Sequence, residues 1–216
     1  MKNMDQQTVG IFGTSSMARE TGDVAYALGY TPIYIAKNEA EACLLKQSES
    51  VLLESDTGKL SELGCVIGIG DNLIREKIFN RFHQSVSFIN LIHPSATVGF
   101  GQSRLIDDAR GLVMCAGARL TNNIRLGNCC IVNQNVSVSP DCSFGNFVHI
   151  APGANISANV TIGDRCWIGA GSVVNQGLID KKMIIESDVM VGSGAVVIGN
   201  CESNAVYAGV PAKRIK

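Results

Sequence analysis

An apolar side chain recurs at every sixth position between residues 114 and 174. The members of this first series are Met114, Leu120, Leu126, Val132, Val138, Phe144, Ile150, Ile156, Ile162, Ile168 and Val174. A second, mostly small series follows each member by four residues: Ala118, Ile124, Cys130, Val136, Cys142, Val148, Ala154, Val160, Cys166 and Ser172. Because the two series share one period, we expect both to line the same buried face.

A period of six fits neither an α-helix nor an isolated strand, but it fits a chain that turns a corner every six residues. It therefore predicts a parallel β-helix, in which three sides of about eighteen residues make one coil and the inward side chains stack. The alternative, a sandwich of short strands, would need turns every eight to twelve residues and a less regular spacing. Residues that tolerate tight backbone turns lie between the apolar positions and suit the corners: Gly127, Asn128, Gly145, Asn146, Gly163 and Asp164.

The repeat extends beyond this core with two interruptions. Ile92 and Val98 keep the spacing, but the step to the next member is four residues longer than two repeats, which predicts a loop or bulge near residues 103–110. The step from Val174 to Ile185 is also longer than one repeat, which predicts an outward loop at residues 176–183. After it the spacing resumes at Ile185, Val191 and Val197.

The first thirty-six residues have a different texture, typical of a βαβ unit. A short apolar strand at 9–12, a Gly/Ser turn, a helix over about 17–28 ending at Gly29, and a strand at 31–36 are expected. Backbone N–H groups of such a turn and of the following helix can hold an anion such as a nucleotide phosphate. The turn lacks the full GxGxxG pattern, so a plain strand-to-helix turn remains the alternative.

The segment up to residue 90 continues this α/β pattern. Residues 39–63 show a helix-like apolar spacing, residues 65–69 an unbroken apolar strand of the kind found inside parallel sheets, and residues 70–72 a turn into an amphipathic helix that ends near Phe82. A last strand at 86–91 would lead into the β-helix. We therefore expect an N-terminal domain at 1–90 and a β-helix domain at 91–216.

Charge and composition favour a small-molecule partner. The chain has 18 basic and 19 acidic residues without a basic cluster, which argues against nucleic acid and against a polybasic membrane surface. The segment MKNMDQQ at the start lacks the apolar core of a signal peptide, and no apolar run approaches the length of a membrane span. We expect a cytoplasmic protein.

Neither the cysteines nor the histidines indicate a metal site. The eight cysteines lack a CxxC spacing, and Cys130, Cys142 and Cys166 fall on the inward series, where Cys is a small apolar filler. The three histidines are scattered along the chain. No catalytic metal is expected.

Five segments in order resemble one family across nearly the whole chain: GIFGTSSMARE, VIGIGDNLIREKIF, LIHPSATVG, the hexapeptides with FVHIAPGA, and AGVPAKRI. The family is that of bacterial hexapeptide-repeat sugar acetyltransferases, which includes nucleotide-linked amino-sugar N-acetyltransferases and sialic acid O-acetyltransferases. The resemblance implies a small Rossmann-like α/β domain followed by a left-handed β-helix. It further implies a homotrimer with acetyl-CoA between adjacent β-helices and the sugar nucleotide on the N-terminal domain.

The resemblance also implies catalytic residues, with one departure. The family places a general-base His where this chain has Pro140, whereas the adjacent Asp141, the upstream Asn133 and the second family histidine, His149, are present. Three interpretations are open: His149 or Asp141 acts as the base, directly or through a water; positioning alone supplies much of the rate; or the protein is a non-catalytic trimer that binds a nucleotide sugar. A packed or solvated His149 at a β-helix corner is the structural alternative for that residue.

Binding residues follow from the same residue-by-residue match. On the cofactor side they are His149, the backbone N–H of Ala158, Ala170, Ser193, and Lys213 or Arg214 for the CoA phosphates, with a solvated basic tail as the alternative for the last two. On the nucleotide-sugar side Ser15, Ser16, Met17 and Gly70 match the family's contacts. Gly13 of the same turn is a further candidate, as is Lys37, which lies at a strand end where relatives often have an acidic residue.

An amine acceptor tolerates the loss of a strong base better than a hydroxyl does, because a neutral amine is already a good nucleophile toward a thioester. The sequence therefore favours an acetyl-CoA-dependent N-acetyltransferase for the 4-amino group of a dTDP- or UDP-linked 4-amino-4,6-dideoxy sugar, in surface polysaccharide or glycan assembly. The alternatives are a sugar O-acetyltransferase of the sialic acid type and the non-catalytic trimer. Neither the nucleotide base nor the stereochemistry of the sugar follows from the sequence.

Overall fold

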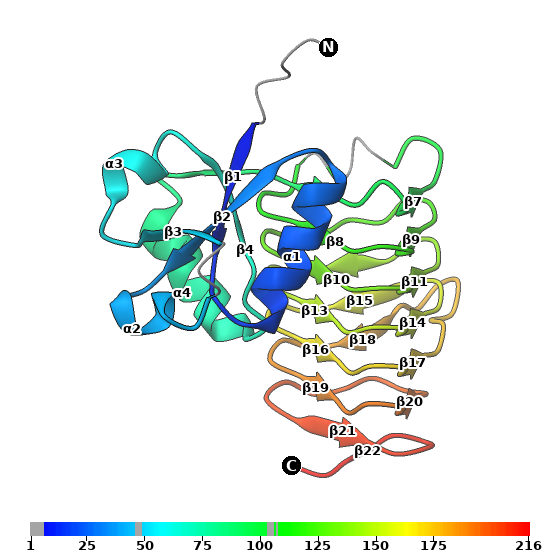
Figure 1. The fold of residues 1–216 in the computed structure, drawn as a ribbon. Coiled ribbons are helices and arrows are strands. Elements are labelled where there is room, and N and C mark those ends of the chain that lie inside the picture. Colours follow the sequence, from blue (N-terminus) through cyan, green and yellow to red (C-terminus); the bar gives the residue numbers. More distant parts are fainter. Residues whose placement is uncertain (1–6, 46–48, 103–105, 107) are drawn as a thin grey trace.

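The computed structural model of the 216-residue chain describes residues 7–45, 49–102, 106 and 108–216. A small α/β unit lies beside a long stack of coils (Figure 1). The α/β unit has a five-stranded parallel sheet in the order β3-β2-β1-β4-β5. Its elements are β1 (Thr8–Phe12), α1 (Ser16–Ala27), β2 (Thr31–Ala36), α2 (Glu39–Ala42), β3 (Ser50–Leu53), α3 (Thr57–Leu60), β4 (Gly64–Ile67), α4 (Asn72–Phe82) and β5 (Ser87–Phe88).

The two long helices cover opposite faces of this sheet. Met17 and Ala18 of α1 pack with Val9 and Ile11 of β1, and the same apolar cluster reaches Ile131 of the β-helix. Helix α4 packs on the other face through a second cluster, which contains Phe12, Ile67 and Phe82 of the α/β unit and Phe147 of the β-helix, among others. The α/β unit is thus joined to the coils by continuous apolar cores, which holds the β1 and β4 turns against the β-helix.

Within the described residues, seventeen short strands form the coils, in sheets of eight, six and three strands. They are β6 (Leu91–Ile92), β7 (Thr97–Val98), β8 (Val113–Met114), β9 (Arg119–Leu120), β10 (Ile131–Val132), β11 (Ser137–Val138), β12 (Ser143–Phe144), β13 (His149–Ile150), β14 (Asn155–Ile156), β15 (Val160–Ile162), β16 (Trp167–Ile168), β17 (Val173–Val174), β18 (Met183–Ile185), β19 (Met190–Val191), β20 (Val196–Val197), β21 (Val206–Ala208) and β22 (Lys213–Arg214). Parallel pairs such as Ile131 with His149 and His149 with Trp167 set one coil at eighteen residues. The predicted parallel β-helix is confirmed.

Both apolar series point inward as predicted and form one buried cluster along the stack. Ser172 is the polar member of the small series, and its hydroxyl donates to the carbonyl of Gly169 at 2.7 Å. Val98 keeps the spacing but is 40% exposed, because it lies in the first, incomplete coil. The chain closes the other end with the antiparallel pair β21 and β22.

The corners differ from the sequence prediction by one position. The left-handed backbone conformations occur at Cys129, Phe147 and Arg165, one residue beyond the predicted Gly-Asn and Gly-Asp pairs. Gly145 is needed for a different reason: a Cβ there would lie 2.6 Å from the backbone N of Asp164 in the next coil. Asn146 binds across coils as well, since its backbone N–H donates to the Asp164 carboxylate at 2.7 Å. These residues therefore allow close stacking and link the coils.

Two predictions for the α/β unit were wrong in detail. Residues 39–63 do not form one helical segment, because residues 50–53 hydrogen-bond to β2 as the parallel edge strand β3, between the single-turn helices α2 and α3. The expected strand at 86–91 is divided between β5, which pairs with β4, and β6, which opens the β-helix. The side chain of Asn90 marks the division by accepting from the Leu112 N–H at 3.0 Å.

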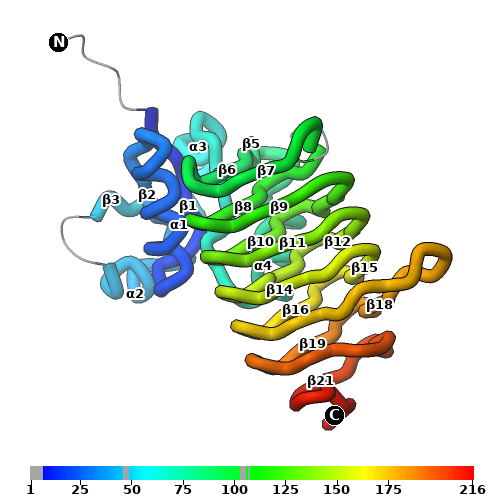
Figure 2. Tube along the Cα trace, turned by 90° about the vertical axis from the view of Figure 1, so that its right-hand side faces the viewer, coloured from blue at the N-terminus to red at the C-terminus, as the bar shows by residue number. Residues whose placement is uncertain are grey.

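The two predicted loops are only partly covered by the described residues. The outward loop at 176–183 is present, projects from the stack (Figure 2) and contains an antiparallel bridge between Leu178 and Lys181. Residues 103–105 and 107 of the other predicted loop lie outside the described residues, while Ile106 and Ala109 are buried. Within the described part of the chain, no helix is long and apolar enough to span a membrane.

The cysteines give a direct test of this packing. All eight are free thiols; Cys43 is exposed and the other seven are buried, and burial raises the pKa of Cys115 and Cys166 to about 12. Since the thiolate is the reactive form, we expect about one thiol per native chain to react with a chromogenic disulfide reagent at pH 8. All eight should react in denaturant. Fast reaction of several thiols in the native protein would contradict the buried inward positions.

Candidate active site

His149 lies where the α/β unit meets the β-helix. It is in β13, with 3% of its surface exposed. Its Nδ1 lies 3.2 Å from the carbonyl oxygen of Gly70, in the turn after β4, and its Nε2 lies 3.4 Å from the side-chain nitrogen of Asn133. Its ring packs against that of Trp167 in the next coil, with centroids 4.1 Å apart. The structure thus brings together the predicted residues His149, Asn133 and Gly70.

The protonation state of His149 follows from these partners. The Gly70 carbonyl can only accept, so Nδ1 carries the proton and the lone pair on Nε2 faces the Asn133 side-chain nitrogen, which can donate to it. Burial and, to a smaller extent, the nearby Arg75 guanidinium lower the pKa of His149 to about 4, although the hydrogen bond to Gly70 acts in the opposite direction. The ring is therefore neutral at pH 7, and Nε2 acts as an acceptor.

The β1 turn lies at the carboxyl end of a central parallel strand, the edge where open α/β sheets bind ligands. Gly13 has φ of +117°, and a Cβ at this position would lie 2.8 Å from a side-chain carbon of Ile69. Ser15 precedes α1 without a side-chain cap to the helix, and both Ser15 and Ser16 are exposed. Met17 is buried in the apolar cluster, so its side chain is core and a ligand would meet its backbone.

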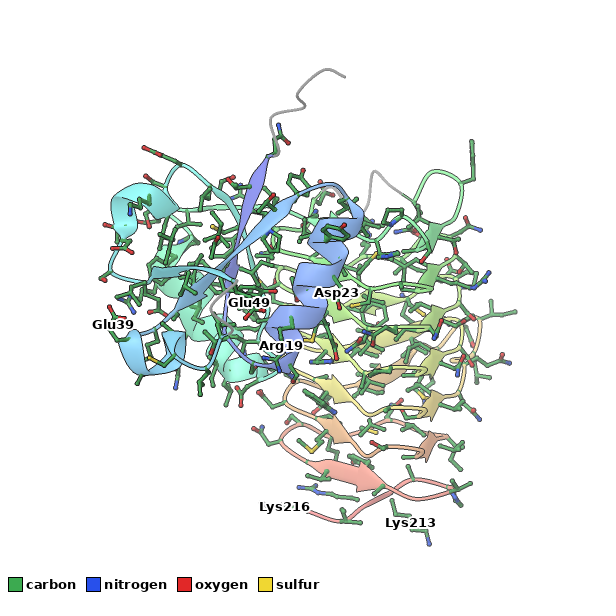
Figure 3. The ribbon with its side chains drawn as sticks, in the orientation of Figure 1. Arg19, Asp23, Glu39, Glu49, Lys213 and Lys216 are labelled. Atoms are coloured by element: carbon green, nitrogen blue, oxygen red, sulfur yellow. The ribbon has the colours of Figure 1, made fainter. Side chains whose placement is uncertain are left out.

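Helix α1 also leads toward His149. Glu20, one turn along α1, lies 3.5 Å from the side-chain nitrogen of Gln134, the residue after Asn133. The β1 turn, the β4 turn and β13 therefore border one region, at the junction of the α/β unit with the coils. Figure 3 shows Arg19 and Asp23 of α1 near this junction, whereas Lys213 lies at the far end of the stack.

Asp141 belongs to a different group of residues, which we call the corner cleft. The cleft has a volume of 490 Å³ and is lined by Asn123, Asp141, Ala158, Asn159, Gln176, Gly177, Ile179 and Lys182. The Asp141 carboxylate accepts from the Asn123 side chain at 2.7 Å, and the Lys182 ammonium donates to the Asp141 carbonyl at 3.0 Å. The predicted oxyanion donor, the backbone N–H of Ala158, therefore belongs to a residue that lines this cleft.

Within one chain the corner cleft is separate from His149. Asp141 lies between β11 and β12, at the corner that joins the six-stranded sheet to the three-stranded one, whereas His149 is in the eight-stranded sheet that faces the α/β unit. Within a single chain Asp141 therefore lies apart from the other two predicted catalytic residues, Asn133 and His149. The eight residues from Asp141 to His149 lead the chain along one side of the β-helix and around the next corner, so two side chains that are close in sequence lie apart in space.

The remaining predicted cofactor residues lie along the lower coils. Ala170 and Ser193 are exposed at equivalent corners of successive coils, and the carbonyl of Ala170 accepts from the Gly194 N–H at 2.8 Å. Lys213 and Arg214 are exposed in β22, but the Arg214 guanidinium is already paired with Glu202 at 2.7 Å. Lys213 is the better candidate for a phosphate contact.

Lys37 borders a second cleft, at the ends of β2 and β3. This cleft of 350 Å³ is lined by Lys37, Glu41, Glu54, Ile74, Lys77, Ile78 and Arg81. Glu54 is buried and paired with Arg81 at 2.6 Å. The sequence prediction included Lys37 but missed the other four charged residues of the cleft, Glu41, Glu54, Lys77 and Arg81, because charged residues are usually on the solvent face of their element. The described residues contain no group of three His, Cys, Asp or Glu placed to hold a metal ion.

Comparison with known proteins gives a consistent picture. Residues 141–176 match the family model for the bacterial transferase hexapeptide (six repeats). The chain is 25% identical to the GDP-perosamine N-acetyltransferase of Escherichia coli O157:H7, over 96% of both chains. It is 28% identical to a putative lipopolysaccharide biosynthesis O-acetyl transferase of Escherichia coli K12, over 67% of this chain and 84% of that protein.

Two solved structures are similar over nearly the whole length. PerB from Caulobacter crescentus, in complex with CoA and GDP-perosamine, is 26% identical, covers 97% of both chains and has a TM-score of 0.84. The acetyltransferase domain of PglB from Neisseria gonorrhoeae, in complex with acetyl coenzyme A, is 25% identical, covers 97% of this chain and 100% of that one, and has a TM-score of 0.82. The resemblance to hexapeptide-repeat bacterial sugar acetyltransferases is confirmed.

Proposed function

We propose that the protein is an acetyl-CoA-dependent N-acetyltransferase that acts on the amino group of a nucleotide-linked amino sugar. The observation that carries this proposal is the buried, neutral His149, whose unprotonated Nε2 is an acceptor at the junction of a nucleotide-type turn with the β-helix. Relatives that align over the whole chain bind CoA and GDP-perosamine or are named for acetylating it, which supports the same activity here.

The chemistry requires little of the protein. The neutral amine attacks the thioester carbonyl, a C–N bond forms, the C–S bond breaks, and the proton of the amine passes to the departing CoA thiolate. With a pKa near 4, His149 is a weak base, so it would accept the proton only from the acidic ammonium of the tetrahedral intermediate. The backbone N–H of Ala158 would donate to the oxyanion.

The nucleotide part would bind the α/β unit. The strand order β3-β2-β1-β4-β5 is that of doubly wound nucleotide-binding sheets, which supports the Rossmann-like assignment. The β1 turn with Ser15 and Ser16 offers backbone and hydroxyl donors to the phosphates, and the cleft beside Lys37 has room for the base. The relatives use a GDP-sugar, so GDP joins dTDP and UDP among the candidate nucleotides.

A homotrimer of left-handed β-helices would complete the site. Since the His149 group and the corner cleft lie on different sides of one chain, acetyl-CoA between adjacent β-helices would meet Ala158 and Asp141 of one chain and His149 of its neighbour. Sedimentation equilibrium tests this directly, and a monomer that turns over at the full rate would contradict it. The product would enter surface polysaccharide or glycan assembly in the cytoplasm.

The deciding experiment measures CoA release with a panel of GDP-, UDP- and dTDP-linked sugars, each as the 4-amino and 4-hydroxy form. Release with one amino sugar alone is expected and would also give the nucleotide. Release with hydroxy sugars would indicate an O-acetyltransferase. Binding of CoA and nucleotide sugar without any release would indicate the non-catalytic trimer. The single exposed thiol of Cys43 sets the background when a thiol reagent is used.

A further inference from the structure

Arg75 is a fully buried arginine that binds backbone carbonyls. It lies in the first turn of α4 with 0% of its surface exposed. Its guanidinium donates at 3.1 Å to Cys129, at 2.9 Å to Ile69, at 2.7 Å to Gly70 and at 2.6 Å to Phe147, each time to the carbonyl oxygen. Among the described residues no carboxylate lies within ion-pair distance of it. A buried cation is costly, so a site that keeps one without a counter-ion indicates a specific role.

The four carbonyls connect the β4 turn with the coils. Ile69 and Gly70 form the turn after β4, whereas Cys129 and Phe147 are equivalent corners of successive coils, both with positive φ. Phe147 precedes His149 by two residues. The Gly70 carbonyl also accepts from Nδ1 of His149 at 3.2 Å. Arg75 thus contacts both the backbone that carries His149 and the carbonyl that fixes its ring.

We propose that Arg75 is a positioning residue for His149: by holding the Gly70 and Phe147 carbonyls in one planar fork, it fixes the imidazole as the Nδ1–H tautomer, with Nε2 as the acceptor. This inference rests on the proposed function for its catalytic consequence, but not for the tautomer itself. A guanidinium suits the task, because its five donors have a rigid planar geometry that a lysine ammonium cannot reproduce.

Arg75 also acts on His149 as a charge. Charged residues from three elements surround the imidazole. Arg75 comes from α4, and Glu20 of α1 contacts Gln134. Arg165 lies beyond Trp167 and is paired with Glu76 and Asp188. Of these groups, Arg75 affects the His149 pKa, in the direction that disfavours imidazolium. Fixed geometry and positive charge therefore favour the same neutral acceptor.

Nitrogen NMR of the full-length protein labelled with ¹⁵N-histidine tests the tautomer without reference to activity. The chain has three histidines, of which His83 and His93 serve as internal references. We expect His149 of the wild-type protein to show a protonated Nδ1 and an unprotonated Nε2 at pH 7, and to remain neutral at pH 5.5. A mixture of tautomers, or titration of His149 near pH 6.5, would overturn the proposal whether or not the protein is an acetyltransferase.

Variants separate positioning from plain docking. Arg75→Lys and Arg75→Met should give mixed tautomers and lower kcat by about 10-fold or more, with the KM for the nucleotide sugar changed much less. In Arg75→Met the pKa of His149 should also rise. The ratio of wild-type to variant kcat, plotted against pH, should show this rise, because the substrate's own titration cancels in the ratio. The matched control is Asn72→Ala, because the Asn72 side chain also joins the start of α4 to a coil corner, through the carbonyls of Arg165 and Cys166, without touching Gly70.

The control decides between the two roles. Asn72→Ala should keep the wild-type His149 spectrum and most of kcat. If Asn72→Ala disturbs the tautomer as much as Arg75→Lys does, or if Arg75→Lys leaves it unchanged, Arg75 is a docking residue and the proposal is wrong. If both Arg75 variants fail to fold, the wild-type spectrum and its titration remain the test.

Discussion

Replacing His149 with alanine is expected to lower kcat by about 10²-fold or more, the range typical for losing a general acid or base. The reason is that Nε2 of His149 is the neutral acceptor that the structure places at the junction of the two units, held by Gly70 on one side and near Asn133 on the other. Nucleotide-sugar affinity should change little, because the β1 turn and the cleft beside Lys37 do not depend on the imidazole. Steady-state assays of CoA release give kcat, and calorimetric titration with the nucleotide sugar gives Kd.

The matched control is His93→Ala, which removes a histidine of the β-helix whose ring bonds to Ser95 in its own turn. This variant should retain wild-type kcat. Wild-type turnover in His149→Ala would remove His149 from the catalytic residues, and the packed-histidine interpretation would then hold. An equal loss of nucleotide-sugar binding and of kcat would instead show that His149 supports the fold of the junction.

The same residue makes stability sensitive to acid. The pKa of His149 is lowered from its ordinary value of 6.5 to about 4 in the folded protein. Well above pH 6.5 the ring is neutral in both states, so it contributes no pH dependence there. As the pH falls from 6.5 toward 4, the unfolded chain binds a proton that the folded chain does not, and the free energy of unfolding decreases. This contribution should be absent in His149→Ala, which urea unfolding at pH 7 and pH 5 would show.

Much of the β-helix could be predicted from sequence because the signal is local and repeated. Each inward residue contacts its equivalents one coil away, so the period of six survives in the sequence, from Met114 to Val174, wherever the stack is regular. The corners were predicted one residue too early, because the requirement for a small residue at Gly145 arises from the next coil and not from the backbone angles of Gly145 itself. A single sequence contains no direct sign of that approach.

The candidate site was predictable in its parts and not in its grouping. His149 and Asn133 are sixteen residues apart, almost one coil, and the structure brings them together. Asp141 is closer in sequence to His149, but lies around a corner. Arg75 was missed entirely, because an arginine on an amphipathic helix resembles a solvent-facing residue, and its burial depends on the coils that pack against α4.

Pro140 offers the second large effect, as a gain of activity. It lies half-buried at the corner between β11 and β12, and its carbonyl accepts from the Asn159 N–H at 3.0 Å, a bond that any residue at this position can keep. Pro140→His would introduce an imidazole beside Asp141, in the position where the resembled family has its base. A neighbouring carboxylate orients such a ring and favours its protonated form, so the imidazole could take a proton at neutral pH. We expect kcat to rise by about 10-fold or more with a hydroxyl acceptor, and less with an amine.

The amine and the hydroxyl acceptor should respond differently to the new base. A neutral amine attacks the thioester before it loses its proton, whereas a hydroxyl needs the proton removed as it attacks, so a new base helps the hydroxyl more. Pro140→Ala is the control for any change in the corner's backbone, and it should not raise CoA release with either acceptor. If Pro140→His and Pro140→Ala behave alike, the corner cleft does not receive the acceptor. If the hydroxyl acceptor gains selectively, Pro140 is the residue that restricts this enzyme to amines.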